Sequence, residues 1–394
     1  MKKRFLVRSC MVLTAAILAI GCLCTSFTGL SGAKLTSYSD VQSLEEGETP
    51  MTGLELTADM KIGWNLGNTF DAPDGETSWG NPMTSEALLQ KVKDLGFETI
   101  RIPISWGRHV SAAPEYTIDE AFLKRVDTVV NQALDIGFYV IINSHHDNEI
   151  YMPTADNSQR GQEYLHAIWT QIGGHFKDAG DHLIFQTMNE PRVEGSSYEW
   201  AIDTGNDDCL ASLQVINELN QTALDAIRAT GGNNSDRFVI ISPYAGNVGA
   251  AMSSYFQLPE DSAEDRLIVS IHAYTPYKLC LDRHSDVTEF TKAHEKEISG
   301  FLKSVNYRFI RKGIPVVIDE MGCLNKNNPE ARYAWAKTYV SLAAEYEIPC
   351  VWWDNGAINS SGENFGLMNR RKVEVYPQSQ TAYQGLMDGL VSED

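Results

Sequence analysis

Short apolar stretches alternate with amphipathic stretches from about residue 60 to the C-terminus. The apolar stretches predict eight strands, at 60–68, 99–106, 138–146, 183–190, 238–243, 267–274, 315–321 and 349–354. The amphipathic stretches predict helices at 85–95, 118–136, 160–176, 208–230, 286–312 and 328–346, with a last helix after Pro377. Glycines that directly follow several of these stretches are expected to end them. Only 245–265, between the fifth and sixth strands, shows no clear long helix.

The predicted strands are apolar nearly throughout, rather than alternating between apolar and polar residues. Strands of this kind are buried on both faces and belong to a parallel sheet covered by crossover helices. Eight successive strand-then-helix units predict an α/β protein with a closed (β/α)8 TIM barrel. The sequence shows no internal repeat and no Gly/Ser-rich linker, so we expect one catalytic domain over 51–394.

The N-terminal region has the pattern of a secretory signal. Four basic residues precede an apolar run at 11–20, which is too short for a membrane-spanning helix, and small residues follow. Small residues at 31–33 predict cleavage before Lys34, which makes 1–33 a signal peptide. A weak lipobox at 19–22 offers the alternative that Cys22 carries a lipid. We therefore expect a secreted, extracellular protein, with a cell-surface lipoprotein left open, and an acidic linker at 34–50.

Charge and cysteine content exclude several classes of function. The 394 residues carry a net charge of −20, and loss of the four basic residues of the signal would leave 28 basic against 52 acidic residues, or −24. Nucleic acids and anionic membranes are poor partners for such a chain.

The four cysteines beyond the signal region have no Cys-x-x-Cys spacing, so a zinc site is not indicated. We expect a monomer with no membrane insertion, no metal and no cofactor.

Polar or aromatic residues stand at or near the ends of most predicted strands. The C-terminal ends of barrel strands are where such folds carry their chemistry. Burying these groups without partners would cost about 1–3 kcal/mol each, so packing alone does not explain them. The candidate site residues are Asn65, Arg101, His145, His146, Asn189, Glu190, His272, Tyr274, Glu320 and Trp353, with Trp79 in a predicted loop.

Two of these residues are carboxylic acids on opposite sides of the predicted barrel. Glu190 precedes Pro191, which cannot continue a central strand, and Glu320 follows the apolar start of strand seven. Two carboxyl groups that flank a glycosidic bond are what glycoside hydrolysis requires, and a separation of about 5–5.5 Å predicts a retaining mechanism. Arg101 beside Glu320 would favour its ionised form, so Glu320 is the expected nucleophile and Glu190 the acid and base.

The remaining candidates are expected to bind a sugar. Asn189 is placed to contact a sugar 2-hydroxyl, and Trp353 and Trp79 offer aromatic faces to a pyranose ring. Several candidates also have a structural alternative, namely a core role for Trp353, a backbone-bonded core histidine at 145 and an ion-pair role for Arg101. His146 is the strand neighbour of His145 and should point the other way, which makes this His-His-Asp stretch a weak metal signal.

Longer motifs around these residues resemble the family five glycoside hydrolases, in particular their bacterial endoglucanase branch. The motifs are GWNLGNTFDA (63–72), WGNP (79–82), IRIPISW (100–106), INSHHD (142–147), MNEPR (188–192), HAY (272–274), DEMG (319–322) and VWWDNG (351–356). The resemblance implies that Glu190 is the acid/base and Glu320 the nucleophile. It also implies that Arg101, His145, Asn189, His272, Tyr274 and Trp353 surround them. Met321 stands where the family more often has phenylalanine.

The resemblance implies a secreted, retaining endo-β-1,4-glucanase, a cellulase acting on cellulose-type, mixed-linkage β-glucan or xyloglucan chains. The sequence shows no cellulose-binding module, which favours soluble or amorphous substrates. A β-mannanase or xylanase on the same barrel is the alternative within this class. An alternative from another class is a catalytically silent, glycan-binding lipoprotein, although such barrels typically lack one of the two acids.

Overall fold

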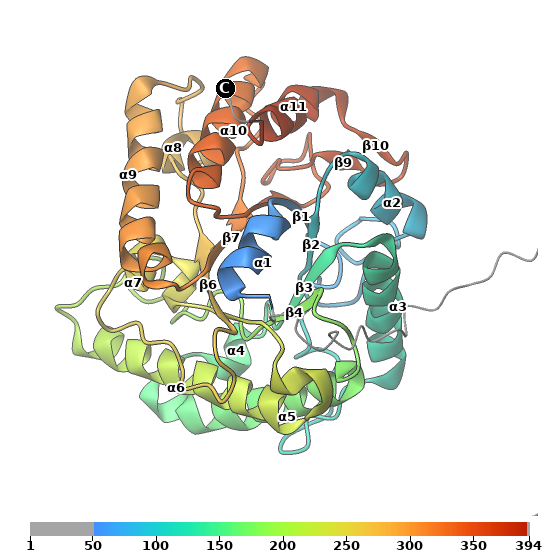
Figure 1. Ribbon diagram of the computed structural model, residues 1–394, viewed down its shortest axis with the longest axis vertical. Helices are drawn as coiled ribbons and strands as arrows, with labels where there is room; N and C mark the ends of the chain where they lie inside the picture. The colour runs from blue at the N-terminus through green and yellow to red at the C-terminus, as the bar shows by residue number, and fades with distance from the viewer. Residues whose placement is uncertain (1–50, 392–394) are drawn as a thin grey trace, which may run out of the picture. The chain divides into compact units, whose positions relative to one another are not determined.

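Eight parallel strands close into a barrel in the computed structural model, which describes residues 51–391 (Figure 1). The strands are β1 (Ile62–Leu66), β2 (Thr99–Ile102), β3 (Tyr139–Asn143), β4 (Leu183–Gln186), β5 (Val239–Ile241), β6 (Leu267–His272), β7 (Val316–Met321) and β8 (Cys350–Asp354). Neighbours in the sheet follow the order of the chain, and β8 closes on β1 with Trp353 opposite Asn65. The predicted (β/α)8 barrel is confirmed.

Helices surround the barrel and cover the outer faces of the strands (Figure 1). The longer ones are α2 (Glu86–Asp94), α3 (Glu120–Ile136), α5 (Ser158–Phe176), α6 (Asp207–Ala229), α9 (Lys292–Arg308), α10 (Pro329–Ala344) and α11 (Gln380–Asp388). Short helices α4 (Asn148–Tyr151), α7 (Val248–Ala251) and α8 (Tyr277–Cys280) lie in loops, and β9 (Met368–Asn369) pairs with β10 (Glu374–Val375). Between β5 and β6 the chain forms only a short 3-10 helix (Tyr244–Gly246) and α7, so the long helix that the sequence pattern also lacked is absent there. Within residues 51–391, no helix combines the length and apolar character that a membrane span needs.

One helix, α1 (Gly53–Met60), precedes the barrel and was not predicted. It begins with a capping box, in which the side chains of Thr52 and Glu55 bond each other's backbone N–H groups. Its buried Leu56 and Met60 pack against the inward-facing apolar residues of the strands. In Figure 1 this helix lies in front of the ring of strands. The predicted start of strand one at residue 60 was wrong because Met60 ends α1, which covers one end of the barrel interior.

The barrel interior is layered, with an apolar layer next to α1 and a polar layer above it. The apolar layer includes Tyr139, Ile141, Ile184, Phe238, Ile240, Ile268, Val317 and Val351. Since side chains alternate along a strand, the residue two positions further on points inward as well. Those positions hold Asn143, Gln186, Ser242, Ser270, Asp319 and Trp353, all buried. The polar layer therefore lies between the apolar layer and the C-terminal ends of the strands.

Strand β7 carries one extra residue relative to both of its neighbours. Val317 lies opposite Ser270 and Glu320 lies opposite His272, so three steps along β7 match two along β6. The same offset occurs against β8. A bulge of this kind re-aims side chains, and here it lets the adjacent acids Asp319 and Glu320 both contact groups inside the barrel.

Three further sequence predictions concern the N-terminal region, the cysteines and the fourth strand. The signal at 1–33, the lipid-bearing Cys22 and the linker at 34–50 lie outside the described residues. The cysteines of the described domain are free and buried, namely Cys209, Cys280, Cys323 and Cys350. The predicted strand at 183–190 was too long, since β4 ends at Gln186 and leaves Glu190 on the segment that follows.

Candidate active site

Glu320 is held at both carboxylate oxygens. Arg101 Nη1 donates to Oε1 at 2.8 Å, and the hydroxyl of Tyr274 donates to Oε2 at 3.0 Å. Glu320 lies on β7, Arg101 on β2 and Tyr274 just after β6, so the barrel brings together three residues that are distant in sequence. The predicted contact between Arg101 and Glu320 is present, and it fixes the orientation of the carboxylate.

Arg101 is fully buried and organises several polar groups around Glu320. Its Nη2 donates to Asn189 Oδ1 at 2.6 Å, its Nη1 also donates to Asn65 Oδ1 at 2.9 Å, and its Nε donates to Gln186 Oε1 at 2.9 Å. A guanidinium group only donates, so these contacts assign the amide orientations. In Asn189 the NH2 group is the end that does not face Arg101.

Asn65 occupies a different position from the one its predicted role requires. It is fully buried, and its Nδ2 donates to the backbone carbonyl of Asp319 at 2.9 Å while its Oδ1 accepts from Arg101. Both ends of the amide are therefore used inside the barrel. This arrangement suits a residue that positions Arg101 better than one that contacts a substrate.

Glu190 lies beside Glu320, and His272 lies between them. His272 Nδ1 is 2.7 Å from Glu190 Oε1 and 3.6 Å from Glu320 Oε2. One carboxylate oxygen from each acid and the histidine nitrogen all lie within 4.8 Å of one another. The two acids are therefore close enough for both to reach one small chemical group.

The charge of His272 is determined by the acids around it. Its other ring nitrogen, Nε2, lies 3.6 Å from Asp319 Oδ1. Burial alone would lower the pKa of His272, but the negative charges of Glu320 and Asp319 and the hydrogen bond with Glu190 raise it to about 10. At neutral pH the imidazole is therefore protonated in the unliganded site.

The two acids respond differently to this surrounding. Burial raises the pKa of Glu320, and the charges of His272 and Arg101 only partly oppose it, so its net pKa is raised. Burial also acts to raise the pKa of Glu190, but the hydrogen bond and charge of His272 outweigh it, so its net pKa is lowered. The sequence suggested that Arg101 would decide the ionisation of Glu320, whereas burial and His272 have larger effects.

The tautomer of His145 follows from its neighbour Asn143. The backbone N–H of Ile104 donates to Asn143 Oδ1 at 3.1 Å, so Asn143 Nδ2 is the end that faces His145 Nδ1, also at 3.1 Å. Nδ1 must then accept, and the ring hydrogen lies on Nε2. Burial and the nearby charges of His146 and Arg101 hold the pKa of His145 well below its usual value. His145 is thus a neutral Nε2–H donor.

His146 lies on the same side as His145, which corrects the expectation that the two point apart. Strand β3 ends at Asn143, so strand alternation no longer applies, and the two rings are 4.4 Å apart. The exposed His146 also lies 5.8 Å from the ring of Trp79, which is 46% exposed. His146 and Trp79, two of the candidate substrate-binding residues, are therefore neighbours.

Among the described residues, two clusters bring three metal-ligand groups within 4.8 Å, Asp71–His145–His146 and Glu190–His272–Glu320. Neither has the hydrogen-bonding state of a metal centre. His145 carries its hydrogen on Nε2, and Asp71 already accepts from the backbone N–H groups of Asn68 and Thr69. In the second cluster the protonated His272 is a donor rather than a ligand.

Trp353 provides the aromatic surface at the end of β8. Its ring lies parallel to that of His145, with centroids 5.7 Å apart and an angle of 3°. Gly67 allows this position, because a Cβ there would lie 2.9 Å from the indole ring. Trp353 is 8% exposed and also packs against Phe365 and Leu324. The residue therefore combines a packing role with an edge open to the site.

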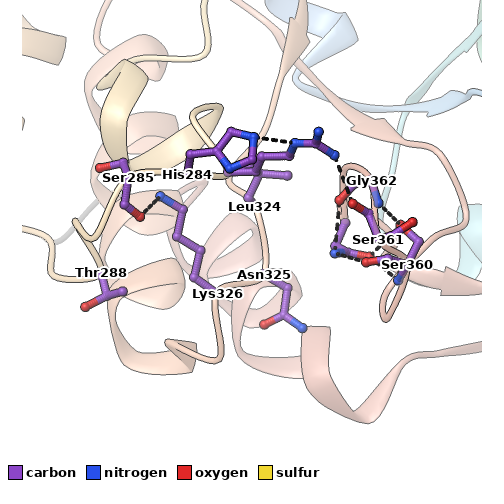
Figure 2. A pocket seen from close by; sticks show the side chains of 11 residues that line it. His284, Ser285, Thr288, Leu324, Asn325, Lys326, Ser360, Ser361 and Gly362 are labelled. Carbon is purple, nitrogen blue, oxygen red and sulfur yellow. Dashed lines mark hydrogen bonds between the residues drawn. The ribbon is translucent and has the colours of Figure 1, made fainter.

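A separate pocket of about 460 Å³ opens between the segments that follow β6, β7 and β8 (Figure 2). Its basic side chains are held by backbone carbonyls. Lys326 Nζ donates to the carbonyl of Lys278 at 2.7 Å, and Arg283 donates to that of Ser361 at 2.9 Å. Leu324 lines the pocket and also packs against Trp353. The pocket thus adjoins the aromatic side of the site, and the two acids are not among its lining residues.

The structure adds residues that sequence reasoning did not place in the site. The sequence shows three polar residues inside apolar strands, Gln186, Asn143 and Asp319, but it does not show which side chains they bond.

Gly246 is a further addition, since a Cβ at this position would lie 2.7 Å from His272 Cγ and its φ is +60°. Only glycine therefore allows the loop after β5 to pass so close to His272.

Comparison with known proteins gives consistent matches over this whole domain. The family model for cellulases, glycosyl hydrolase family 5, matches residues 65–359. Endoglucanase A of Ruminococcus albus is 41% identical over 340 residues, which cover 84% of this chain and 91% of that protein. Cellulase/esterase CelE of Acetivibrio thermocellus is 40% identical over 362 residues, which cover 91% of this chain. The match spans only 43% of CelE.

A solved structure shows the same arrangement of the barrel. It is a GH5-4 broad-specificity endoglucanase from Ruminococcus champanellensis with bound cellotriose. The two superpose with a TM-score of 0.81 at 40% sequence identity, covering 86% of this chain and 99% of that one.

Proposed function

Since this chain belongs to glycosyl hydrolase family 5, the cellulase family, we propose that it is a retaining endo-β-1,4-glucanase. The observation that carries this proposal is the proximity of Glu190 and Glu320, whose oxygens approach within 4.8 Å. Retaining glycosidases hold their acids about 5–5.5 Å apart, whereas inverting ones need about 6.5–9.5 Å to admit a water. The short separation favours direct attack by one of the acids.

The proposed reaction is a double displacement. Glu320 attacks the anomeric carbon and forms a glycosyl ester, while the glycosidic C–O bond breaks and its oxygen takes a proton from Glu190. In the second step Glu190 removes a proton from a water molecule, which attacks the same carbon and releases the Glu320 carboxylate. The fixed contacts from Arg101 and Tyr274 support the role of Glu320, because they hold an attacking oxygen in one orientation.

The 2.7 Å contact between Glu190 and His272 supports Glu190 as the proton carrier. In the unliganded site the proton resides on His272 Nδ1, since the pKa of Glu190 is lowered and that of His272 is raised. Transfer of this proton along the hydrogen bond gives neutral Glu190 and neutral His272. The pair therefore holds one proton available to a leaving oxygen.

Other side chains would bind the sugar units. The Asn189 NH2 group, which faces away from Arg101, is available to a 2-hydroxyl, and the His145 Nε2–H is available to another hydroxyl oxygen. Trp353 and Trp79 would stack against pyranose rings, with His146 beside Trp79. Asn65 acts indirectly, through Arg101.

The proposed substrates are cellulose-type, mixed-linkage β-glucan or xyloglucan chains, as expected for a neutral polymer and an acidic protein. Reducing-end release from carboxymethylcellulose, barley β-glucan and xyloglucan tests this, with mannan and xylan as the alternatives. Turnover restricted to mannan or xylan would support the second candidate of the same class. Binding without turnover of any polysaccharide would support the silent, glycan-binding lipoprotein, although both acids are present and oriented.

We also propose that the protein acts outside the cell as a monomer. The proposal on location rests on the basic and apolar pattern at the N-terminus, with cleavage before Lys34 or lipidation at Cys22 as its two forms. An intact mass of the mature protein, from medium and from membranes, distinguishes a chain that begins at Lys34 from one with acyl groups on Cys22.

A further inference from the structure

A third buried acid, Asp319, lies below the proposed catalytic pair and has no part in the double displacement. Its side chain is fully buried. Its carboxylate accepts from Ser270 Oγ at 2.8 and 2.9 Å and from Gln186 Nε2 at 2.6 Å, and Arg101 Nε lies 3.8 Å away. An isolated buried carboxylate is costly, so this one is held in its ionised form by donors and a cation.

His272 lies between Asp319 and Glu190 in a way that requires a proton. Carboxylate oxygens face both ring nitrogens, with Glu190 at 2.7 Å from Nδ1 and Asp319 at 3.6 Å from Nε2. A neutral imidazole donates from only one nitrogen. With both acids ionised, the favourable state is therefore the imidazolium, which donates to Glu190 from Nδ1 while Asp319 lies near Nε2 as a counter-ion.

Gln186 connects this acid to the other side of the site. Its Oε1 accepts from Arg101 Nε at 2.9 Å and from Asn143 Nδ2 at 3.2 Å, while its Nε2 donates to Asp319. The amide cannot be reversed, because Arg101 has only donors and ionised Asp319 has only acceptors. One fully buried side chain thus links Asp319, Arg101 and the partner of His145.

We propose that Asp319 and Gln186 are positioning residues for the glycosidase reaction. Asp319 is the counter-ion that keeps His272 in the imidazolium form beside Glu190. Gln186 fixes the positions of Asp319 and Arg101 relative to each other, because it bonds both side chains. The inference deepens the proposed function and rests on it only where Glu190 is taken as the acid.

Several charged groups contribute to the field at His272, so the pH dependence belongs to the cluster. Glu190, Asp319 and Glu320 face the ring directly. Further groups act on Glu190 and Glu320 from the other strands and loops, namely Arg101, His146, Arg192, Tyr274 and Glu363. Removal of Asp319 leaves the other groups in place, so its own contribution can be isolated.

The first experiment titrates the imidazole in the intact wild-type protein. NMR of 15N-histidine-labelled protein, with the His272 signal assigned by its loss in His272→Gln, should show imidazolium shifts up to at least pH 8. A His272 signal that is already neutral at pH 7 would overturn the proposal. This measurement requires no activity, so it separates failure of the inference from failure of the proposed function.

The second experiment changes the acid. In Asp319→Asn the imidazolium loses one counter-ion, so the His272 titration should move down by about one pH unit, the scale of a single nearby charge. Because Glu190 and His272 share one proton, the pair should then lose this proton at lower pH, so the basic limb of kcat/KM should move to lower pH as well. Asp261→Asn is the matched control, since Asp261 is also nearly buried and pairs with Arg228 at 2.7 Å, elsewhere in the fold.

Unchanged titration and an unchanged basic limb in a folded Asp319→Asn protein would overturn the role of Asp319, as would an equal shift in the control. If Asp319→Asn does not fold, the wild-type titration still tests whether His272 is an imidazolium, and the Gln186 variants below test the contacts of Asp319.

Gln186 is tested by a pair of variants. Gln186→Met removes both the acceptor and the donor, and kcat should fall roughly 10–100-fold, the cost of a misplaced catalytic group, with KM changed much less. Gln186→Glu keeps the acceptor, and only its protonated form can donate to Asp319. Its activity should therefore recover toward that of wild type at acid pH and fall again as the added carboxyl ionises. Equal activity of all three proteins at every pH would overturn the role of Gln186.

Discussion

His272 Nδ1 lies 2.7 Å from Glu190 Oε1, so the charge of the histidine and the protonation of the glutamate depend on each other. The effect is opposite on the two partners, with the pKa of His272 raised and that of Glu190 lowered. In the proposed mechanism Glu190 must nevertheless supply a proton. That proton lies on the neighbouring nitrogen of His272, within one hydrogen bond of Glu190.

The raised pKa of His272 predicts how stability depends on pH. The folded-state value of about 10 lies above the ordinary value of 6.5. The stabilisation from the protonated ring is therefore complete below pH 6.5 and is lost as pH rises through about 10. Urea unfolding should show that the advantage of wild type over His272→Gln shrinks between pH 6.5 and 10. An advantage that is constant over this range would contradict the assigned charge.

The two acids should respond differently to the quality of the leaving group. Glu190→Gln should lose roughly 10²–10⁴-fold in kcat on cello-oligosaccharides, the usual contribution of general acid–base catalysis. It should lose much less in the first step on a dinitrophenyl cellobioside, because that leaving group needs no proton. Glu320→Gln should lose at least about 10⁴-fold on both substrates, as expected when a nucleophile is removed. Stopped-flow release of dinitrophenolate measures the first step. The same pattern for both variants would mean that the roles are assigned wrongly.

Arg101 should not be replaceable by lysine. Its guanidinium bonds Glu320, Asn65, Asn189 and Gln186 at once, and an ammonium group has three donors and a different shape. Arg101→Lys should therefore lose about 1–3 kcal/mol of unfolding free energy through unpaired buried acceptors, and kcat should fall. Chemical denaturation and initial rates measure the two effects. Full activity in Arg101→Lys would show that orientation of Glu320 by the guanidinium is not required.

Gly246 should be needed for activity, whereas a glycine with similar backbone strain elsewhere should not. Gly246→Ala and Gly313→Ala each place a side chain at positive φ, +60° and +80°, which costs about 1–2 kcal/mol. Only at Gly246 would the new Cβ also meet His272, at 2.7 Å from Cγ. Thermal unfolding should show the larger loss in Gly246→Ala, because the clash adds to the backbone strain, and kcat should fall only in this variant. Equal kcat values would indicate that the loop around residue 246 moves to relieve the clash and that His272 keeps its position.

Trp79 should contribute to substrate binding rather than to the chemical step. Its ring is 46% exposed and lies against His146, and truncation of an aromatic contact of this kind costs roughly 5–10-fold in affinity. Trp79→Ala should raise KM for long cello-oligosaccharides and leave kcat nearly unchanged. Tyr307→Ala, at a position that is 71% exposed on α9, is the control and should change neither. A fall in kcat without a change in KM would contradict a binding role.

The sequence predicted the barrel well because apolar strands and glycine-ended helices are local patterns. Gly137, for example, ends α3 in the left-handed conformation, as expected. Helix α1 was missed because its apolar residues Leu56 and Met60 are few, and because its role depends on the barrel that it covers. The end of β4 was also misplaced, since Pro191 sets only an outer limit and β4 ends at Gln186, four residues before Glu190.

The residues of the candidate site could be named from the sequence, but their network of contacts could not. Strand ends identified the two acids, yet the inward turn of both Asp319 and Glu320 depends on a bulge in β7 that no local pattern reveals. The same holds for His146, which lies on the side of His145 because β3 ends early. The relative pKa values depend on burial and on His272, which comes from a third strand, and so required the three-dimensional arrangement.

Covalent trapping tests the central claim, that Glu320 attacks the sugar while Glu190 handles the proton. The enzyme would be incubated with a 2-deoxy-2-fluoro-cellobioside that carries a good leaving group, digested, and analysed by tandem mass spectrometry. The account predicts one fluoroglycosyl group, bound to Glu320 through an ester. A label on Glu190, or turnover of cello-oligosaccharides to the inverted anomer with no label at all, would contradict it.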